Sequence, residues 1–400
     1  MKNFLINMGK KSKKAFAQKL SPQKKDKVLK DYYHLIIKNK KLIINQNKKD
    51  IKVAKKKKIK NNLIQRLILD DKKISNIIGS IKKIIKLKDP TNRILEKWKR
   101  PNGLNISKIS IPIGVINVIY ESRPNVTSDV ASLCFKSGNT VILKGGSEAF
   151  YSNLILSKLF RISLKKNHVD ENFIQFINVK NRKVVDFLLT NMGKFIDIII
   201  PRGGKKLVKK VQGLSTVPII GHLEGICHSY VDKDANLQIA KKIVRNAKLR
   251  NTAICGATET ILFHEKIIKK IGIKILKDLE DNGCKIIGDN KIRKFYNKKI
   301  RKASIKDWSK EYLAPIVSVK SVRSIDEAIH HINKYGTMHT DCIITQNSKS
   351  AKKFLDQVKS SIAMHNTSTQ FADGEEFGFG GEVGISTNTL PPRGPVGLNQ

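Results

Sequence analysis

Apolar residues in the first part of the chain follow a helical period. Between Lys10 and about Asn62 they recur at intervals of three and four, as in "VLKDYYHLIIKNKKLII". This spacing puts apolar side chains on one face of a helix. The pattern therefore predicts long amphipathic helices over this segment.

The pattern changes after "KDPTNRI". Asn102 and Gly103 are a turn signal between two extended segments, and the apolar run from Gly114 to Tyr120 predicts a strand. Strands "TVILK", "FIQFINV" and "FIDIIIP" then alternate with helices near Val126 to Ser137, at Glu148 to Leu164 and at "RKVVDFLLTN". Because these strands lack polar alternation, both of their faces should be covered, as in a parallel sheet.

A second alternating unit begins at about Gly221. Its predicted strands are "ICHSYVD", "ETILFH", "APIVSVK", "TDCIITQ" and "SIAMHN", with helical segments between them. The Gly-rich stretch "TSTQFADGEEFGFGGEVGISTNTLPPRGPVG" that follows predicts loops that shape a site. The whole pattern indicates an α/β protein with more than one domain, as 400 residues would suggest.

The net charge of +45 raises the question of nucleic-acid binding. The first hundred residues hold 32 Lys or Arg against 7 Asp or Glu, whereas the last hundred hold 12 against 10. The excess lies in segments such as "VAKKKKIKNN", and no aromatic residues alternate with the basic ones in a way that suits base stacking. We interpret the charge as a compositional bias on solvated faces.

The five cysteines are odd in number, widely spaced and without a CxxC pair. This argues against a disulfide framework and against a zinc site, so no metal site is predicted. The N-terminal "FLINM" is too short for a signal peptide, and no apolar run is long enough to span a bilayer. We expect a protein of the reducing cytoplasm.

Cys255 lies in a polar gap, "LRNTAICGATE", between a helical run and a strand. Its small neighbours Gly256 and Ala257 would let a substrate approach, and Lys248 and Arg250 would favour the thiolate, which is the nucleophilic form. The alternative is a buried structural thiol. Gly203 and Gly204 mark a second candidate position, because they follow a predicted strand directly and would either receive a phosphate or make a tight turn.

Six blocks of sequence resemble the aldehyde dehydrogenase superfamily, and more closely its gamma-glutamyl phosphate reductase (glutamate-5-semialdehyde dehydrogenase) branch. They are "PIGVINVIYESRPNVTSDVASLCFKSGNTVILKGGSEA", "DIIIPRGGKKL", "STVPIIGHLEGICHSYVD", "NAKLRNTAICGATETIL", "HTDCIITQNSKSAKKFL" and "FGFGGEVGISTNTLPPRGPVGL". No single block is decisive, but their order from Ile111 to Leu398 is specific. The resemblance implies a Rossmann-type cofactor domain, an α/β catalytic domain and a small oligomerisation hairpin.

The resemblance places the nucleophile at Cys255 and the oxyanion-stabilising side-chain amide at Asn125. Attack on an acyl carbon creates an oxyanion, which a fixed amide donor and a backbone N–H stabilise. The alternative role for Asn125 is to cap the helix that follows it. The other residues implied are Lys144, Glu148, Gly203, Gly204 and Glu311 for the cofactor, and Arg123, Asn366, Ser368, Gln370 and Arg393 for the substrate.

The implied reaction is reduction of an acyl phosphate by NADP(H). Cys255 displaces phosphate from L-glutamyl 5-phosphate, and the resulting thioester is reduced to glutamate 5-semialdehyde, on the path to proline. Hydrolytic relatives carry a water-activating glutamate in "ELGG", where this chain has "HLEG" and therefore His222. We expect His222 to be structural.

The chain departs from the family pattern in two places. Gln370 stands where the family usually has an arginine, and it cannot supply that residue's charge to a carboxylate or phosphate. Relatives also continue beyond "RGPVGL" with a strand that pairs with the hairpin, so the segment 386–400 is expected to be shortened and the hairpin to keep an open edge.

The predicted domains are a cofactor domain (1–95 and 112–222), the hairpin (96–111) and a catalytic domain (223–385). The resemblance implies a homodimer and a glutamate 5-kinase partner. Two rival hypotheses stay open: another acylating aldehyde dehydrogenase, and a basic polyanion-binding protein that has lost activity.

Overall fold

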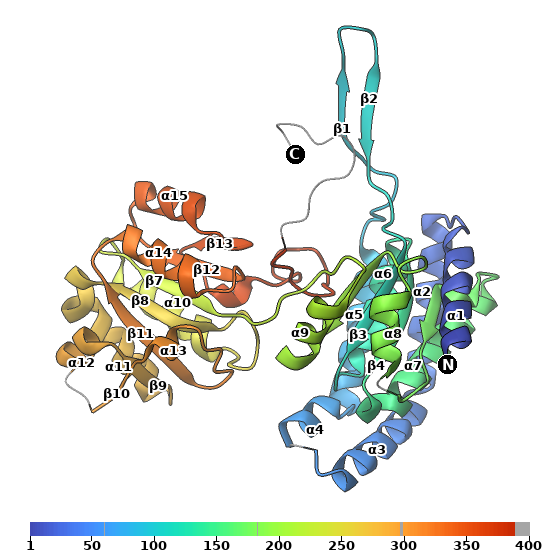
Figure 1. Ribbon diagram of the computed structural model, residues 1–400, viewed down its shortest axis with the longest axis horizontal. Helices are drawn as coiled ribbons and strands as arrows, with labels where there is room; N and C mark the ends of the chain where they lie inside the picture. Colours follow the sequence, from blue (N-terminus) through green and yellow to red (C-terminus); the bar gives the residue numbers. More distant parts are fainter. Residues whose placement is uncertain (60, 182, 297–298, 389–400) are drawn as a thin grey trace. The chain divides into compact units, whose positions relative to one another are not determined.

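The structure is a computed structural model that describes residues 1–59, 61–181, 183–296 and 299–388 (Figure 1). The chain divides into two compact units. The first comprises Met1–Gly221 and Gly380–Gly384, and the second comprises His222–Phe379 and the chain from Ile385. The break falls one residue before the predicted boundary. The short segment Gly380–Gly384 packs with the first unit, whereas the sequence had assigned it to the catalytic domain.

Helices open the first unit. They begin earlier and continue farther than the predicted segment: α1 (Lys2–Phe16), α2 (Pro22–Lys38), α3 (Lys40–Lys56), α4 (Asn61–Leu67) and α5 (Asp71–Lys86). The Ser21 side chain caps α2, and the Asp70 side chain caps α5. Asp50 of α3 accepts hydrogen bonds from the backbone N–H groups of Tyr151 (3.0 Å) and Ser152 (2.8 Å), which ties the helices to the rest of the unit.

A four-stranded parallel sheet forms the centre of the first unit, in the order β5-β4-β3-β6, as the alternating pattern predicted. Its strands are β3 (Val115–Tyr120), β4 (Thr140–Gly145), β5 (Ile174–Phe176) and β6 (Ile198–Arg202), and its helices are α6 (Asn125–Lys136), α7 (Phe150–Lys166), α8 (Lys183–Asn191) and α9 (Lys205–Leu214). Ile116 and Val118 of β3 pack in one core with α2, α5, α6 and α7. Val115 and Ile119 pack in another with α1, α8 and α9, so both faces are covered.

The Asn-Gly signal corresponds to an antiparallel hairpin of β1 (Ile94–Lys99) and β2 (Asn105–Ile109), which projects from the first unit (Figure 1). Gly103 has a φ of +87°, a conformation that glycine adopts without strain. Trp98 is 41% exposed and Ile109 is 50% exposed. A two-stranded hairpin alone is marginally stable in water. Its role in oligomerisation stays a prediction.

The second unit contains a seven-stranded parallel sheet, in the order β10-β9-β11-β8-β7-β12-β13. The strands are β7 (Cys227–Val231), β8 (Thr258–His264), β9 (Lys285–Gly288), β10 (Arg301–Lys302), β11 (Ile316–Val322), β12 (Thr340–Ile344) and β13 (Ile362–His365). The helices are α10 (Leu237–Leu249), α11 (Ile273–Asp281), α12 (Asn290–Tyr296), α13 (Ile305–Trp308), α14 (Ile325–Tyr335) and α15 (Ser348–Gln357).

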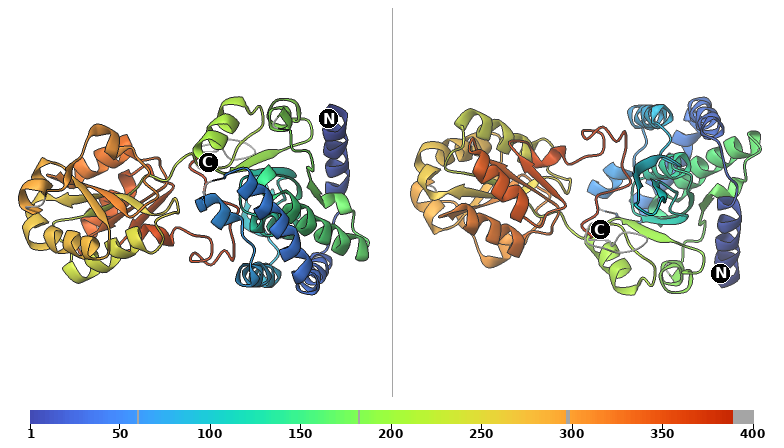
Figure 2. Two further views of the ribbon diagram at one scale, coloured as in Figure 1. Left: turned by 90° about the horizontal axis from the view of Figure 1, so that it is seen from below. Right: turned by 90° about the horizontal axis from the view of Figure 1, so that it is seen from above.

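Helices cover both faces of this second sheet (Figure 2). Ile261 and Phe263 of β8 pack with α10 and α11, and Leu262 packs with α14 and α15. Strands β9 and β10 and helices α12 and α13 were not predicted, because such short elements show little periodicity. Among the described helices, none is long and apolar enough to cross a membrane.

Candidate active site

The described part of the chain includes all five cysteines, and none of the five forms a disulfide bond. Burial raises the pKa of Cys134 to about 12, of Cys284 to about 11 and of Cys342 to about 12, and it raises that of Cys227 well above the usual value. Cys255 alone is only half-buried, in the turn that joins α10 to β8. Access therefore selects Cys255 as the candidate nucleophile.

The two cations expected to favour the Cys255 thiolate have carboxylate partners elsewhere. The Lys248 ammonium is fully buried and lies 2.6 Å from Glu259, while Arg250 lies 2.7 Å from Glu376. Burial raises the pKa of Glu259 to about 7, although Lys248 opposes the shift. Lys248 therefore anchors the end of α10 to β8, and its charge is offset by Glu259.

Backbone segments pack closely against the Cys255 turn. A Cβ atom added to Gly225 would lie 2.0 Å from the carbonyl oxygen of Cys255, and one added to Gly256 would lie 3.1 Å from the carbonyl oxygen of Thr369. The Cys227 thiol also donates to the Cys255 carbonyl, at 3.1 Å. Glycine at 225 is required for this approach, which fixes the position of the turn.

Glu311 is connected to the same turn. Its Oε1 accepts a hydrogen bond from the Gly225 N–H at 2.9 Å, so this carboxylate is engaged with the protein. The loop around Glu311 is held on both sides, because Tyr312 Oη donates to Asp307 at 2.9 Å and the Leu313 N–H donates to Glu259 at 3.2 Å. Neighbouring contacts thus place Glu311 beside the Cys255 turn.

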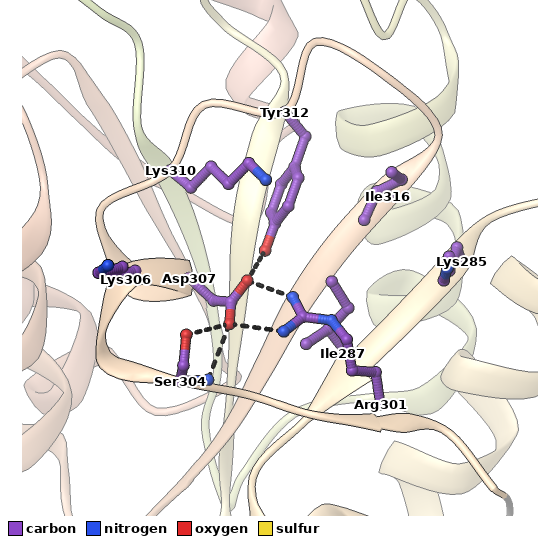
Figure 3. A pocket seen from close by; sticks show the side chains of 9 residues that line it. All are labelled: Lys285, Ile287, Arg301, Ser304, Lys306, Asp307, Lys310, Tyr312 and Ile316. Carbon is purple, nitrogen blue, oxygen red and sulfur yellow. Dashed lines mark hydrogen bonds and ion pairs between the residues drawn. The ribbon is translucent and has the colours of Figure 1, made fainter.

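Asp307 is the centre of the pocket in Figure 3. Both of its carboxylate oxygens accept hydrogen bonds from the Arg301 guanidinium. The carboxylate also accepts hydrogen bonds from the N–H (2.7 Å) and the hydroxyl (2.6 Å) of Ser304. Burial alone would raise the pKa of Asp307, but the hydrogen bonds from Arg301 and Ser304 outweigh it and lower the pKa strongly. None of the predicted site residues lines this pocket, and its contribution is to support the Glu311 loop.

Two histidines lie beside Cys255. His222 Nδ1 is 2.9 Å from the Ile385 carbonyl oxygen, and its ring centroid is 4.7 Å from that of His339. His339 is fully buried, and burial together with the nearby His222 lowers its pKa to about 3. The sequence analysis missed His339, since nothing in "TMHTDC" indicates that it approaches the cysteine turn.

Asn125 belongs to the first unit, at the beginning of α6. Its side-chain amide donates to Asp129 at 3.0 Å. The N-cap of α6 is Pro124, and no side chain caps this helix, so the alternative role of Asn125 as a cap is wrong. The hydrogen bond to Asp129 orients the Asn125 amide, and its oxyanion role stays a prediction.

The predicted cofactor residues of the first unit gather at the carboxyl ends of its strands. Strand β4 lies on one side of β3, and β6 lies on the other, so the direction in which strands are added reverses at β3. Open α/β sheets bind ligands at the carboxyl ends of the strands where this reversal occurs. Lys144 is buried, with its ammonium 2.8 Å from the Gly145 carbonyl, so it is not a solvated strand end. Burial lowers the pKa of Lys144, and the Glu148 carboxylate opposes the shift.

Carboxylates line the same edge. Glu148 accepts hydrogen bonds from the N–H (2.7 Å) and hydroxyl (2.8 Å) of Ser122. Gly204 is the N-cap of α9, and its N–H donates to Glu121 at 2.9 Å. A Cβ on Gly203 would lie 2.6 Å from the same Glu121 oxygen. Glu121, which the sequence analysis did not select, therefore lies where a cofactor phosphate was expected.

The predicted substrate residues of the second unit are largely engaged with the protein. Asn366 binds the backbone of Thr345 through both its oxygen (3.0 Å) and its nitrogen (2.8 Å). Ser368 is buried and caps a short 3-10 turn. Gln370 is 3% exposed and donates to the Ala247 carbonyl at 2.8 Å, so it is directed to the end of α10. Arg123 lies between β3 and α6, and Arg393 lies outside the described residues.

Comparison with known proteins identifies the class. The model of the aldehyde dehydrogenase family matches residues 6–282 and 301–386. Gamma-glutamyl phosphate reductase from Nautilia profundicola is 45% identical over 380 residues, covering 95% of this chain and 92% of the relative. The enzyme of that name from Thermodesulfovibrio yellowstonii is 42% identical over 402 residues, covering 100% and 96%.

A solved structure agrees with these relatives. The crystal structure of gamma-glutamyl phosphate reductase from Thermotoga maritima has a TM-score of 0.93 and 37% identity, covering 98% of this chain and 95% of its own. The chain thus belongs to the aldehyde dehydrogenase family and is an oxidoreductase of that type. Within this family its relatives are gamma-glutamyl phosphate reductases, which confirms the resemblance found in the sequence.

Proposed function

We propose that this chain catalyses the NADPH-dependent reduction of L-glutamyl 5-phosphate to L-glutamate 5-semialdehyde and phosphate, in proline biosynthesis. The observation that carries the proposal is the half-buried thiol of Cys255. The backbone carbonyl of Cys255 packs against Gly225, and the Gly225 N–H donates a hydrogen bond to Glu311. The relatives named gamma-glutamyl phosphate reductase support the choice of substrate.

The first chemical step uses the Cys255 sulfur. The thiolate attacks the acyl carbon, the bond from that carbon to the phosphate oxygen breaks, and phosphate leaves with the electron pair. The oxyanion formed during attack would be stabilised by the Cys255 N–H and the Asn125 amide. Asp129 holds the Asn125 amide in one orientation, which is what a preorganised donor requires.

The residues present suit the nicotinamide cofactor that the aldehyde dehydrogenase family uses. Lys144 and Glu148 would hold it at the strand ends of the first unit, and Glu311 would bind the ribose next to the nicotinamide. When bound, the cofactor supplies the hydride that reduces the thioester carbonyl. A cofactor phosphate at the Gly204 N–H would have to replace Glu121, which is exposed and free to turn toward solvent.

Water must stay away from the thioester until reduction is complete. Hydrolytic relatives have a glutamate where this chain has His222, and His222 Nδ1 is held by the Ile385 carbonyl. Without a carboxylate at this position, no general base of that kind activates water against the thioester. The substitution therefore favours reduction of the thioester, or its transfer to phosphate in the reverse reaction, over hydrolysis.

The test is the reverse reaction, in which glutamate 5-semialdehyde and phosphate reduce NADP or NAD. We expect phosphate-dependent NADPH formation, with NADP preferred. Cys255→Ser should lose on the order of a thousand-fold or more in kcat. Cys227→Ser, the matched control on a buried neighbouring thiol, should keep most of the activity. Equal losses in the two variants would show that Cys255 was the wrong choice.

Gln370 favours a second candidate, another acylating aldehyde dehydrogenase. Its amide is buried against Ala247, so it offers no cation to the substrate carboxylate. If kcat/KM for simple aliphatic aldehydes exceeds that for glutamate 5-semialdehyde in the presence of phosphate, this second candidate is the better one. We also propose that a gamma-glutamyl phosphate reductase of this kind acts in the cytoplasm, forms a homodimer and works with a glutamate 5-kinase.

A further inference from the structure

Three ligand-type side chains from distant parts of the second unit meet at the nucleophile. His222 begins the unit, Cys255 lies in the turn before β8, and His339 immediately precedes β12. One ring nitrogen of each histidine and the Cys255 sulfur all lie within 4.8 Å of one another. The mechanism above assigns no role to either imidazole.

Hydrogen bonds occupy the Nδ1 atom of each of the two histidine rings. A carbonyl oxygen only accepts, so His222 Nδ1 carries a hydrogen toward Ile385, and the lone pair of the neutral ring is on Nε2. His339 Nδ1 lies 2.9 Å from the Thr340 hydroxyl, while its buried Nε2 has no hydrogen-bonding partner. A metal at this point would satisfy a buried polar atom that the protein leaves unmatched.

The ligand set selects the type of metal. Thiolate and imidazole are the preferred ligands of Zn²⁺, and none of the three groups is a carboxylate, which Ca²⁺ and Mg²⁺ favour. Tetrahedral zinc, with bonds of about 2.0 to 2.3 Å, brings its ligand atoms to roughly 3.5 Å from one another. Side-chain movements of about 1 Å would therefore close the site, and the fourth position would remain for water or phosphate.

We propose that His222, Cys255 and His339 form a reversible Zn²⁺ site that inhibits the enzyme by capturing its nucleophile. Binding forms a bond from zinc to the Cys255 sulfur and releases the thiol proton to solvent, with no change in oxidation state. The metal site itself rests on the geometry of the three side chains. The inhibition rests in addition on the proposed function, because it requires Cys255 to be the nucleophile.

Binding is measured on the purified full-length chain with Co²⁺ as an optical probe and with Zn²⁺ in competition. We expect one metal per chain and a thiolate-to-cobalt charge-transfer absorption that Cys255→Ser abolishes. In His222→Asn and His339→Asn, the new side chain keeps a polar atom near the position of Nδ1, but it lacks the Nε2 atom that would bind the metal. Each should weaken Zn²⁺ binding about tenfold or more.

The control is His168→Asn, on an exposed residue of the first unit whose φ of +53° asparagine tolerates. It should bind Zn²⁺ as the wild type does. His222 is only half-buried, so His222→Asn provides a folded test even if the variant of the buried His339 does not fold. Equal affinity in His222→Asn and His168→Asn, or full affinity in Cys255→Ser, overturns the site.

Activity separates the two proposals. An active enzyme that Zn²⁺ inhibits, and that a chelator restores, supports both. An active enzyme that neither binds Zn²⁺ nor is inhibited by it overturns the metal site and leaves the proposed function standing. A chain that binds Co²⁺ through Cys255 but forms no NADPH with phosphate and glutamate 5-semialdehyde overturns the proposed function and leaves the metal site.

Discussion

Gly225 allows a direct test of how the proposed nucleophile, Cys255, is positioned. In Gly225→Ala, the new Cβ would lie 2.0 Å from the carbonyl oxygen of Cys255 and 2.6 Å from its carbonyl carbon. Unbonded heavy atoms normally stay about 3.5 Å apart, so the two backbones must separate by roughly 1.5 Å. Both contacts are with backbone atoms, which means that no side-chain rotation can relieve them.

The shift should affect catalysis more than folding. Overpacking of this kind typically costs about 1–3 kcal/mol of unfolding free energy. A nucleophile displaced by about 1 Å loses on the order of a hundred-fold in rate. Movement of Gly225 also disturbs its hydrogen bond to Glu311, the residue proposed to bind the ribose next to the nicotinamide. We therefore expect a fall of about a hundred-fold in kcat together with a raised KM for NADP.

Phosphate-dependent NADPH formation and urea unfolding measure the two effects separately. Gly272→Ala is the matched control, because its Cβ would meet Phe263 at 3.6 Å and Ile268 at 3.8 Å, which are ordinary van der Waals distances. It should keep wild-type kcat. If Gly225→Ala folds and its kcat stays within twofold of the wild type, then contact between Gly225 and the Cys255 carbonyl does not position the thiol.

Three further predictions concern stability and assembly. Burial raises the pKa of the Glu259 carboxyl group from about 4.5 to about 7, so the folded chain binds this proton more tightly than the unfolded chain. The free energy of unfolding of the chain should therefore fall as the pH rises through this range. In urea titrations at several pH values, Glu259→Gln should reduce this dependence of the unfolding free energy on pH. The pKa of Asp307 is lowered instead, so Asp307→Asn should lose about 1–3 kcal/mol of unfolding free energy relative to the wild type at neutral pH. This difference between the two proteins should shrink below about pH 4, and a difference that stays constant would contradict the argument. Trp98→Lys, on the exposed hairpin, should leave the melting temperature of the chain nearly unchanged while lowering its mass in sedimentation, and an unchanged mass would argue against oligomerisation through the hairpin.

The sequence by itself determined the class of fold and selected Cys255 as the candidate nucleophile. Apolar strands without polar alternation predicted parallel sheets, because strands covered on both faces have no solvent side. The Asn-Gly pair predicted the hairpin turn, and a cysteine in a polar gap predicted an accessible thiol. These properties are local, since they depend on neighbours along the chain or on one repeated interval.

Only the tertiary structure decided which side chains meet. Lys248 was expected to act on the nearby Cys255, yet it is buried against Glu259 of the adjacent strand. Gln370 was expected at the substrate, yet its amide binds the end of α10. His339 carries no signal in the sequence, and the parallel order of β7, β8 and β12 is what brings the residues flanking these strands together. Strand order depends on the packing of the whole sheet, which a local pattern does not encode.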